Sequence, residues 1–477
     1  MRRLAPVLVL ALASTAHAGT FEATPADDLE AKINALVAGD ELIVHGGTYT
    51  LSGRFGISLA GTAAAPIVIR AADGERPVID RPAADQNIWD LDRADYVTIR
   101  GLEWKGGSAG VRITAADHLT IEDCEIHDTA DVALRANDGG AVYRNLLIRH
   151  NHIHDTDGTG EGMYLGCNSN ACRVLDSIIE RNHVHHTNGP TVAQGDGIEL
   201  KEGSAANVIR DNVIHDTKYP CILTYATVGN GGPNVIEGNA LWGCGDHAIQ
   251  SAADAIIRNN LILGSVANGI AMQPHQAGTP ANLVVVHNTV LHATNDAIRV
   301  SGITGAVTIA NNALYAQAGN AIAASGTMAG LIVAGNRGVG ALSGVSGGFT
   351  ASTLDGDLVS GGYAGAPPMD LFPRVGSSLI GAGDPAHAVA IDFNGVARTA
   401  GVDVGAYAFA AGGNPGWQLA ADFKGFPVGG GDVDAGVDGG GGEAGGCCQT
   451  GATPAAPTAL GLLVALALAR RRRRRIS

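Results

Sequence analysis

A lysine next to a carboxylate is the sharpest chemical signal in this sequence. The pair lies in the segment Gln194–Ser204, which reads QGDGIELKEGS, and the whole chain has only five lysines. In an extended strand the two apolar residues that flank Glu199 point inward, so Glu199 and Lys201 share the outward face, about 7 Å apart. Such a pair predicts either a catalytic site or an exposed surface ion pair, whose loss would change stability little.

A carboxylate beside a lone amine suits β-elimination on an acidic sugar. In that reaction a base removes the proton next to a uronate carboxylate, and a cation held by acidic side chains neutralises that carboxylate. We assign Lys201 as the base, with Tyr225 or His215 as a proton source. Glu199 and Asp196 are the candidate metal ligands, and Ca²⁺ is the only cofactor that the sequence indicates.

The elements that must position these residues are short repeated strands. One motif recurs with an asparagine between apolar residues, and its copies are 21 to 31 residues apart. A fixed motif at variable spacing indicates one structural turn with loops of different sizes. The motif asparagines are Asn151, Asn182, Asn212, Asn239, Asn260, Asn288 and Asn312, and the same slot holds Leu102, Cys124 and Asn336 at the edges.

A second short strand precedes many copies of the motif and alternates inward and outward side chains. The chain is therefore expected to be all-β, a single-stranded right-handed parallel β-helix (a solenoid) with its asparagines in one ladder and about 4.8 Å per coil. Amphipathic helical repeats are the alternative, which the Asn, Gly and β-branched content disfavours. The second strands are Val111–Ile113, Met163–Leu165, Ile198–Leu200, Ile270–Met272, Ile298–Val300 and Ile322–Ala324.

Stacked coils would bring further polar side chains close to Lys201. Residues at the same position of neighbouring coils lie one ladder step apart, so they share the outward face. The candidate substrate-binding residues are Glu161, Tyr164, Asp196, Glu202, Gln250, Gln273, His275 and Arg299.

Four histidines fall three residues after successive ladder positions and should therefore stack on four coils. They are His127, His154, His185 and His215, and the next slot holds Asp128, Asp155, His186 and Asp216. We interpret this ladder as packing and turn bonding rather than metal binding, although a surface ladder of His and Asp is able to take up a divalent cation.

The cysteines suit an oxidising compartment. Cys167 and Cys172 bracket one loop, and Cys221 and Cys244 are 23 residues apart, about one coil, so each pair is a disulfide candidate. Cys124 occupies the asparagine slot and is expected to be a buried free thiol. Zinc is the competing interpretation for so many Cys and His, but no CxxC pair occurs.

The two ends of the chain have the features of targeting segments and not of the folded body. Residues 1–18 have an arginine pair, a short apolar run and a small-residue cleavage site, the layout of a signal peptide. After a Gly/Asp-rich linker come Cys447 and Cys448, a short apolar stretch and six arginines. This tail resembles the C-terminal sorting tails of myxobacterial surface proteins, and the alternative is a simple anchor oriented by its arginines. We expect an exported protein, attached to the outer membrane surface or secreted.

The expected domain organisation follows from these features. A helix over 29–37 should cap the first coil and protect its strand edges. The expected boundaries are a signal peptide at 1–18, cap and first strands at 19–60, β-helix at 61–345, closing module at 346–412, Gly/Asp-rich linker at 413–446 and sorting tail at 447–477.

The opening segment, with Gly39–Val44 and Pro66–Ala71, resembles secreted β-helix polysaccharide lyases of the chondroitinase B and alginate lyase type. The Glu199–Lys201 stretch is similar to the strand that carries a metal-binding Glu and the catalytic Lys in that family. The Asp-Gly-x-x-x-Lys pattern is also similar to that of pectate lyases with a lysine base. The first family has an arginine on the next coil, where Cys221–Tyr225 has none, and the second has an Asp-rich calcium site, which the sequence lacks. Ser378–Gly383 and Val402–Tyr407 resemble the closing module of bacterial surface β-helix proteins.

The charge of the body limits the partners. Without the eight arginines of the two ends and the four acids of the linker, 23 basic and 42 acidic residues remain, a net charge near −19. Such a surface disfavours nucleic acid and requires a cation or local base for an acidic glycan. We expect a monomer, and two functions stay open for it. It is either a polysaccharide-active enzyme or a non-catalytic adhesin or glycan-binding rod. A lyase is the favoured enzyme, and a hydrolase would use two of Asp196, Glu199 and Glu202.

Overall fold

The computed structural model describes residues 18–276, 278–398 and 401–425. All described residues belong to one compact unit. Residues 1–17 of the expected signal peptide, and the whole expected sorting tail with Cys447 and Cys448, lie outside the described residues. Within the described part no helix is long and apolar enough to span a bilayer.

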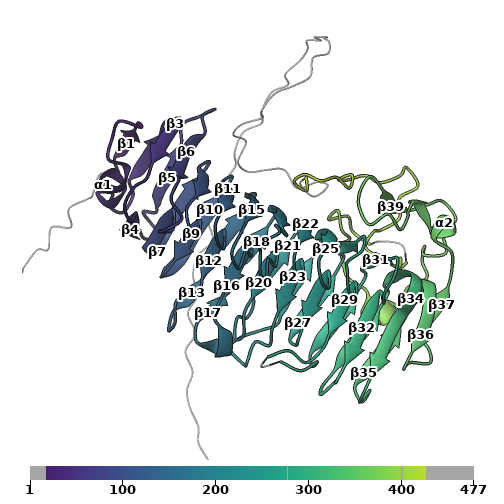
Figure 1. Cartoon of the computed structure of the whole chain (residues 1–477). Coiled ribbons are helices and arrows are strands. Elements are labelled where there is room, and N and C mark those ends of the chain that lie inside the picture. Colours follow the sequence, from purple (N-terminus) through teal and green to yellow (C-terminus); the bar gives the residue numbers. More distant parts are fainter. Residues whose placement is uncertain (1–17, 277, 399–400, 426–477) are drawn as a thin grey trace, which may run out of the picture. The chain divides into compact units, whose positions relative to one another are not determined.

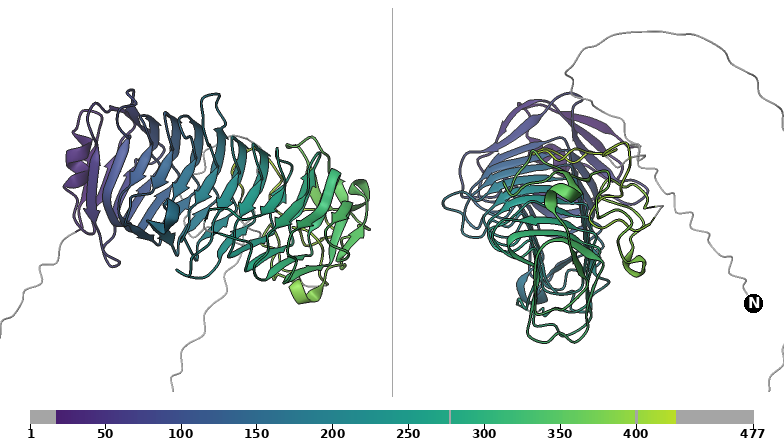
Figure 2. Two further views of the ribbon diagram at one scale, coloured as in Figure 1. Left: turned by 60° about the horizontal axis from the view of Figure 1, so that its bottom comes forward. Right: turned by 90° about the vertical axis from the view of Figure 1, so that its right-hand side faces the viewer.

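The described residues form a right-handed parallel β-helix, as the repeats predict. Strands of successive coils pair in parallel and stack along one axis (Figures 1 and 2). This pairing begins at Thr20 and ends at Ala351, beyond both limits expected from the sequence. A typical coil has three strands, one in each of three sheets. Two turns separate the strands of a coil, and a third turn leads into the next coil.

The first sheet ends each coil at the asparagine ladder. Its strands are β1 (Thr20–Ala23), β2 (Glu41–Val44), β5 (Ile67–Ala71), β7 (Trp89–Arg100), β10 (Ala116–Glu122), β14 (Leu147–Arg149), β18 (Ile178–Glu180), β21 (Val208–Arg210), β24 (Asn234–Glu237), β27 (Ala255–Arg258), β30 (Leu283–Val286), β33 (Val307–Ala310) and β35 (Leu331–Ala334). Beside it β13 (Val142–Arg144) pairs with β17 (Arg173–Leu175).

The second sheet follows the ladder. Its strands are β3 (Gly47–Thr50), β6 (Pro77–Arg81), β8 (Glu103–Gly106), β11 (Glu125–Thr129), β15 (His152–Thr156), β19 (His183–Thr187), β22 (Val213–Thr217), β25 (Ala240–Cys244), β28 (Leu261–Ile262), β31 (Thr289–His292), β34 (Ala313–Ser325), β36 (Asn336–Ser343) and β37 (Phe349–Ala351).

The third sheet carries the Glu199–Lys201 strand. Its strands are β4 (Gly56–Ala60), β9 (Val111–Ile113), β12 (Leu134–Ala136), β16 (Met163–Leu165), β20 (Ile198–Leu200), β23 (Ile222–Thr224), β26 (Ile249–Ser251), β29 (Ile270–Met272) and β32 (Ile298–Ser301). The long strand β7 belongs to both the first and third sheets, and β34 and β36 belong to both the second and third.

The asparagine ladder is one continuous column from Cys124 to Asn336, which confirms the expected arrangement. At Asn212 the side-chain oxygen accepts from the backbone and side-chain nitrogens of Asn182, both at 2.9 Å. Its amide nitrogen donates to Ile179 O and to Asn239 Oδ1, each at 3.0 Å. Every polar atom of the buried amide is therefore paired, which fixes the register of neighbouring coils. Cys124 is a buried free thiol at the end of this column.

A short helix closes the first coil. It is α1 (Leu29–Asn34), shorter than expected, and the Asp28 side chain caps it by accepting from Ala31 N at 3.0 Å. Leu29 and Ile33 are buried against the coil, so the helix covers apolar surface that would otherwise face water.

The C-terminal part folds back over the outer face of the second sheet (Figure 1). It contains α2 (Leu354–Asp357), the antiparallel pair β38 (Leu358–Ser360) and β39 (Asp370–Pro373), and the short 3-10 helix Pro385–His387. Residues 413–425, expected to be linker, are packed: Lys424 is buried, and its Nζ lies 2.6 Å from Asp211 Oδ1 and 2.7 Å from Phe393 O. The linker expectation is wrong for this segment, because buried contacts fix it to the coils.

Candidate functional site

Three strands of the third sheet bring the predicted residues together. The register places Tyr164 of β16 beside Glu199 of β20, and Glu199 beside Leu223 of β23. Lys201 and Tyr225 follow directly after their strands, so both side chains leave the sheet at the same edge. The period of the coil thus gathers residues that lie up to about sixty positions apart in the chain.

Lys201 is the centre of a buried cluster and not an exposed strand residue. Its side-chain nitrogen lies 2.7 Å from Glu199 Oε1 and 3.2 Å from the Tyr225 hydroxyl, which itself donates to Glu199 Oε1 at 2.9 Å. Only 3% of Lys201 and 2% of Glu199 is exposed. The alternative of an exposed surface pair is therefore wrong, and we expect the removal of Lys201 to cost stability because it would leave a buried carboxylate without its partner.

Two further carboxylates lie beside this cluster. Carboxylate oxygens of Glu161, Asp196 and Glu199 all lie within 4.8 Å of one another, and all three side chains are buried. Both oxygens of Glu161, Oδ1 of Asp196 and Oε2 of Glu199 have no hydrogen-bond partner. Burial above all, and then the charge of Glu199, raises the pKa of Glu161 and raises that of Asp196 well above its ordinary value.

These orphaned oxygens fit a hard cation. Buried polar groups are normally paired, so a group of buried acceptors without donors indicates a missing positive partner. Carboxylate oxygens are the ligands that Ca²⁺ prefers. Glu161 therefore joins Asp196 and Glu199 as a third candidate ligand, although the sequence assigned it only to substrate binding.

A pocket of about 300 Å³ opens beside Lys201. The His275 ring stacks on the Tyr225 ring at 5.2 Å, and burial lowers the pKa of this histidine. Burial, reinforced by the charge of Glu199, raises the pKa of both Tyr164 and Tyr225, so these phenols keep their protons at neutral pH. The wall consists of Tyr164, Asn168, Gln194, Asp196, Glu199, Lys201, Tyr219, Leu223, Tyr225, His275 and Gln276.

Several predicted residues lie elsewhere. The Glu202 side chain accepts from the backbone nitrogen of Ser169 and does not line the pocket. Arg299 pairs with Asp296 at 3.3 Å, four coils from Lys201. His215 lies on the second sheet, so it cannot be the proton source at Lys201. Gln273 donates to Gln250 at 3.4 Å, and neither lines the pocket.

Five wall residues were not among the predicted site residues: Asn168, Gln194, Tyr219, Leu223 and Gln276. Asn168 lies in the loop that the Cys167–Cys172 disulfide closes, Tyr219 lies in the turn after β22, and Leu223 replaces the outward polar residue of its coil. The structure also joins Cys221 to Cys244, directly before β23. The loops carry no repeated motif, so only the composition around each cysteine could have pointed to them.

The predicted histidine column is present on the second sheet. Ring centroids of His127, His154, His185 and His215 follow one another at 5.1, 5.1 and 5.0 Å, and Trp242 continues the stack at 4.6 Å. The stack is parallel within 10°, as expected for a ladder of like residues on a regular coil.

Comparison with known protein families places the coils among β-helix proteins. A family described as "Pel9A-like, right handed beta helix region" matches residues 9–217, and one described as "Right handed beta helix region" matches residues 176–314. The segment Gln194–Ser204 lies within both matches. Each match covers less than half of the chain.

Individual relatives are distant. Pectate lyase PEL9 of Emericella nidulans is 28% identical over 194 residues, which cover 40% of this chain and 43% of that protein. The chain therefore matches less than half the length of this relative. Among solved structures, XylC with xylose aligns with a TM-score of 0.54 and 11% identity, over 83% of this chain and 99% of the other. Pectate lyase Pel9A aligns with a TM-score of 0.48 and 14% identity, over 82% and 96%. The XylC likeness supports the fold alone.

Proposed function

We propose that this protein is a polysaccharide lyase that cleaves a uronate-containing glycan by β-elimination, with Lys201 as the base. The observation that carries the proposal is the buried contact of Lys201 with Glu199 and Tyr225 in the wall of an open pocket. A buried charged cluster of this kind costs stability, and such clusters gather where a protein performs chemistry. The similarity to a pectate lyase supports the same substrate class, and the Pel9A-like family match over residues 9–217 includes this strand.

Three residues of the pocket wall have different roles in the proposed reaction. Lys201 lies at the pocket wall with its nitrogen held by two hydrogen bonds, so it is positioned to accept a proton from a bound sugar once it is uncharged. Tyr225 retains its phenolic proton and reaches the same carboxylate oxygen, which suits it to protonate the leaving oxygen. His275 stacks on Tyr225 and limits its movement.

Glu161, Asp196 and Glu199 are the residues that would hold Ca²⁺. When bound there, the ion supplies the positive charge that an acidic sugar requires at a site otherwise rich in carboxylates. Without such a charge the three carboxylates repel a uronate. Among the residues of the pocket wall, Lys201 is the only lysine or arginine, and the other basic side chain is the imidazole of His275.

We further propose that the protein acts outside the cytoplasm, attached through its C-terminal tail. Two disulfides in the described residues support an oxidising compartment. The layout of the two ends in the sequence supports export and surface attachment.

The test is a product assay with the full-length chain. The protein is incubated with pectate, alginate and glycosaminoglycans, with Ca²⁺ or with a chelator, and the ultraviolet absorbance of unsaturated uronate is followed. We expect absorbance with one polymer class, and we expect the chelator to suppress it. New reducing ends without absorbance would indicate a hydrolase. Binding without any cleavage would instead favour the non-catalytic glycan-binding rod.

A further inference from the structure

The outer face of the second sheet carries two adjacent columns of imidazoles. The register pairs His152 with His183 in one column and His154 with His185 in the other. Within a strand, residues two apart point to the same face, so the two columns stand side by side. They lie on a different sheet from Lys201, and the inference below does not depend on the proposed lyase activity.

The two columns are joined by diagonal contacts that change character along the coils. In the first two contacts a carboxylate faces an imidazole, which is a favourable pairing for a protonated histidine. In the next two contacts an imidazole replaces the carboxylate, so two Nε2 atoms face each other. The contacts are Glu103–His127 at 3.2 Å, Glu125–His154 at 3.1 Å, His152–His185 at 2.8 Å and His183–His215 at 2.9 Å.

Where two Nε2 atoms face each other, at least one nitrogen lone pair is available to bind a metal ion. A neutral imidazole has one N–H and one lone pair, so a pair of them forms at most one hydrogen bond through these atoms. Glu125 Oε1 lies 3.4 Å from His152 Nδ1 and favours the proton on that nitrogen, which turns the Nε2 lone pair of His152 toward His185. A carboxylate that orients an imidazole in this way is the usual outer partner of a metal-binding histidine.

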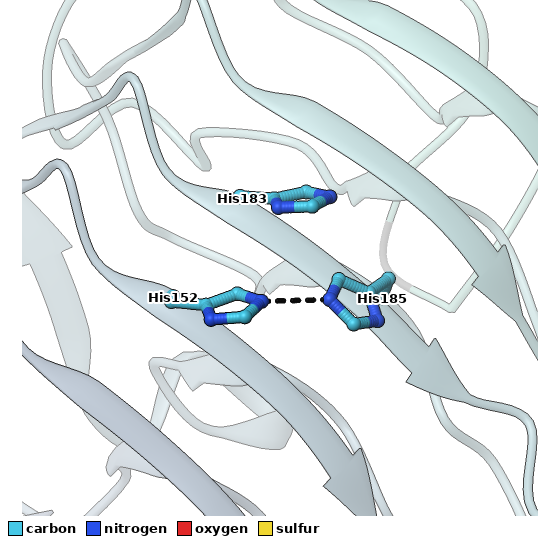
Figure 3. A group of neighbouring side chains, drawn as sticks. All are labelled: His152, His183 and His185. Carbon is cyan, nitrogen blue, oxygen red and sulfur yellow. Dashed lines mark hydrogen bonds between the residues drawn. The ribbon is translucent and has the colours of Figure 1, made fainter. Parts of the chain in front are cut away.

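We propose that His152, His183 and His185 form a binding site for a divalent transition-metal ion such as Zn²⁺. One ligand nitrogen from each ring lies within 4.8 Å of the others, and His152 and His185 point toward each other (Figure 3). A Zn–N bond of about 2.0–2.1 Å in tetrahedral geometry needs nitrogens slightly more than 3 Å apart, so small ring rotations suffice. Imidazole donors favour Zn²⁺, Cu²⁺ or Ni²⁺ over Ca²⁺, which distinguishes this site from the carboxylate group beside Lys201.

The site is partly covered by a neighbouring side chain and partly exposed to solvent. The Phe423 ring lies 5.8 Å from the His183 ring and 6.1 Å from the His152 ring, so the C-terminal segment covers part of it. The His152 side chain is 31% exposed, which leaves a route for an ion and for a water as further ligand. An ion at this position would join two neighbouring coils, and through Phe423 it would lie against the packed segment 413–425.

The test is metal titration of the full-length chain in buffer with excess Ca²⁺, which occupies oxygen-donor sites. Zn²⁺ binding is measured by calorimetry, and Co²⁺ binding by the visible absorption of the ion in a nitrogen-ligand site. His152→Ala and His185→Ala each remove one ligand from a partly exposed position, so both variants should fold. His127→Ala is the matched control, since His127 stands in the same stack but contacts Glu103.

We expect one equivalent of Zn²⁺ to bind the unmodified chain and the His127→Ala variant equally. Binding should weaken at least about tenfold in His152→Ala and His185→Ala, because even outer partners of a ligand contribute about 10- to 100-fold. Zn²⁺ should also raise the melting temperature of the unmodified chain but not of these two variants. The proposal is overturned if the unmodified chain does not bind Zn²⁺, or if both variants bind it as tightly as the control, which would place the ion elsewhere, for example at Cys447 and Cys448.

Discussion

Replacing Glu161 by glutamine should stabilise the protein and at the same time impair its response to Ca²⁺. The carboxylate is fully buried, and neither of its oxygens accepts a hydrogen bond. Because its pKa is raised above the ordinary 4.5, mainly by burial, the folded state binds more protons than the unfolded state just above that pH. Stability contributed by the protonated form is therefore lost as the pH rises from about 4.5 toward the raised value, and the amide, which stays neutral, avoids this loss.

The magnitude follows from the cost of an unpaired buried polar group. That cost is about 1 to 3 kcal/mol, and more for a charged group. With an unfolding entropy of about 2.1 cal/mol/K per residue, a body of about 400 residues changes its melting temperature by about 1 °C for each kcal/mol. Glu161→Gln should thus melt about 1 to 4 °C higher at neutral pH without Ca²⁺, and this advantage should shrink as the pH is lowered.

The assay is thermal unfolding followed by circular dichroism, at neutral and mildly acidic pH, with and without Ca²⁺. At 100 times its dissociation constant a ligand stabilises the folded state by about 2.7 kcal/mol, and we expect this gain in the unmodified chain and a smaller one in Glu161→Gln. Glu22→Gln is the control, because the Glu22 side chain is 69% exposed and its loss should matter by less than about 0.5 kcal/mol. A lower melting temperature for Glu161→Gln together with an unchanged Ca²⁺ response would refute the reasoning.

Three other expectations concern the ladder, a disulfide and the tail. Asn212→Ala removes an amide with four hydrogen bonds and should lower the free energy of unfolding in urea by about 2 to 6 kcal/mol. Asn188 is exposed, so Asn188→Ala should leave that free energy almost unchanged. Equal effects of the two changes would show that the ladder does not stabilise the coils. Replacing Cys221 and Cys244 by serine opens a link between residues 23 apart and should cost about 3 kcal/mol in the same measurement, and an unchanged midpoint would contradict this. Deleting Cys447–Ser477 should move the protein from membrane fractions to the medium in an immunoblot, and retention with membranes would contradict the anchoring proposal.

The coil could be predicted because its determinants are local and repeated. Each ladder asparagine stands between two apolar strands and bonds its counterpart on the next coil, so the same residue types recur at each turn. A second, shorter stack of Ser177, Asn207 and Asn234 was not predicted. It spans only three coils and so leaves too weak a repeat to detect in a single sequence.

The burial of the site could not be predicted from strand alternation. Alternation correctly placed Glu199 and Lys201 outside the apolar interior of the coil, but it says nothing about what covers that outer face. Loops of unrelated length and sequence supply the cover, including Tyr219 and the segment around His275. Residues 413–425 were expected to be linker for the same reason. A few individual contacts, such as those of Lys424, fix this segment to the coils, and no sequence repeat marks it.

The most direct test of the central claim is elimination by the Lys201→Met variant on the polymer that the unmodified chain cleaves. Methionine keeps the bulk of the buried side chain and removes the amine, and circular dichroism checks that the coils remain folded. Loss of a positioned base should lower the rate of unsaturated product formation by a factor of about 10² to 10⁴, while glycan binding persists. Lys105→Met is the control, because Lys105 is exposed on the second sheet and should not affect the rate. A folded Lys201→Met variant that forms product at the unmodified rate would contradict the assignment of this lysine as the base.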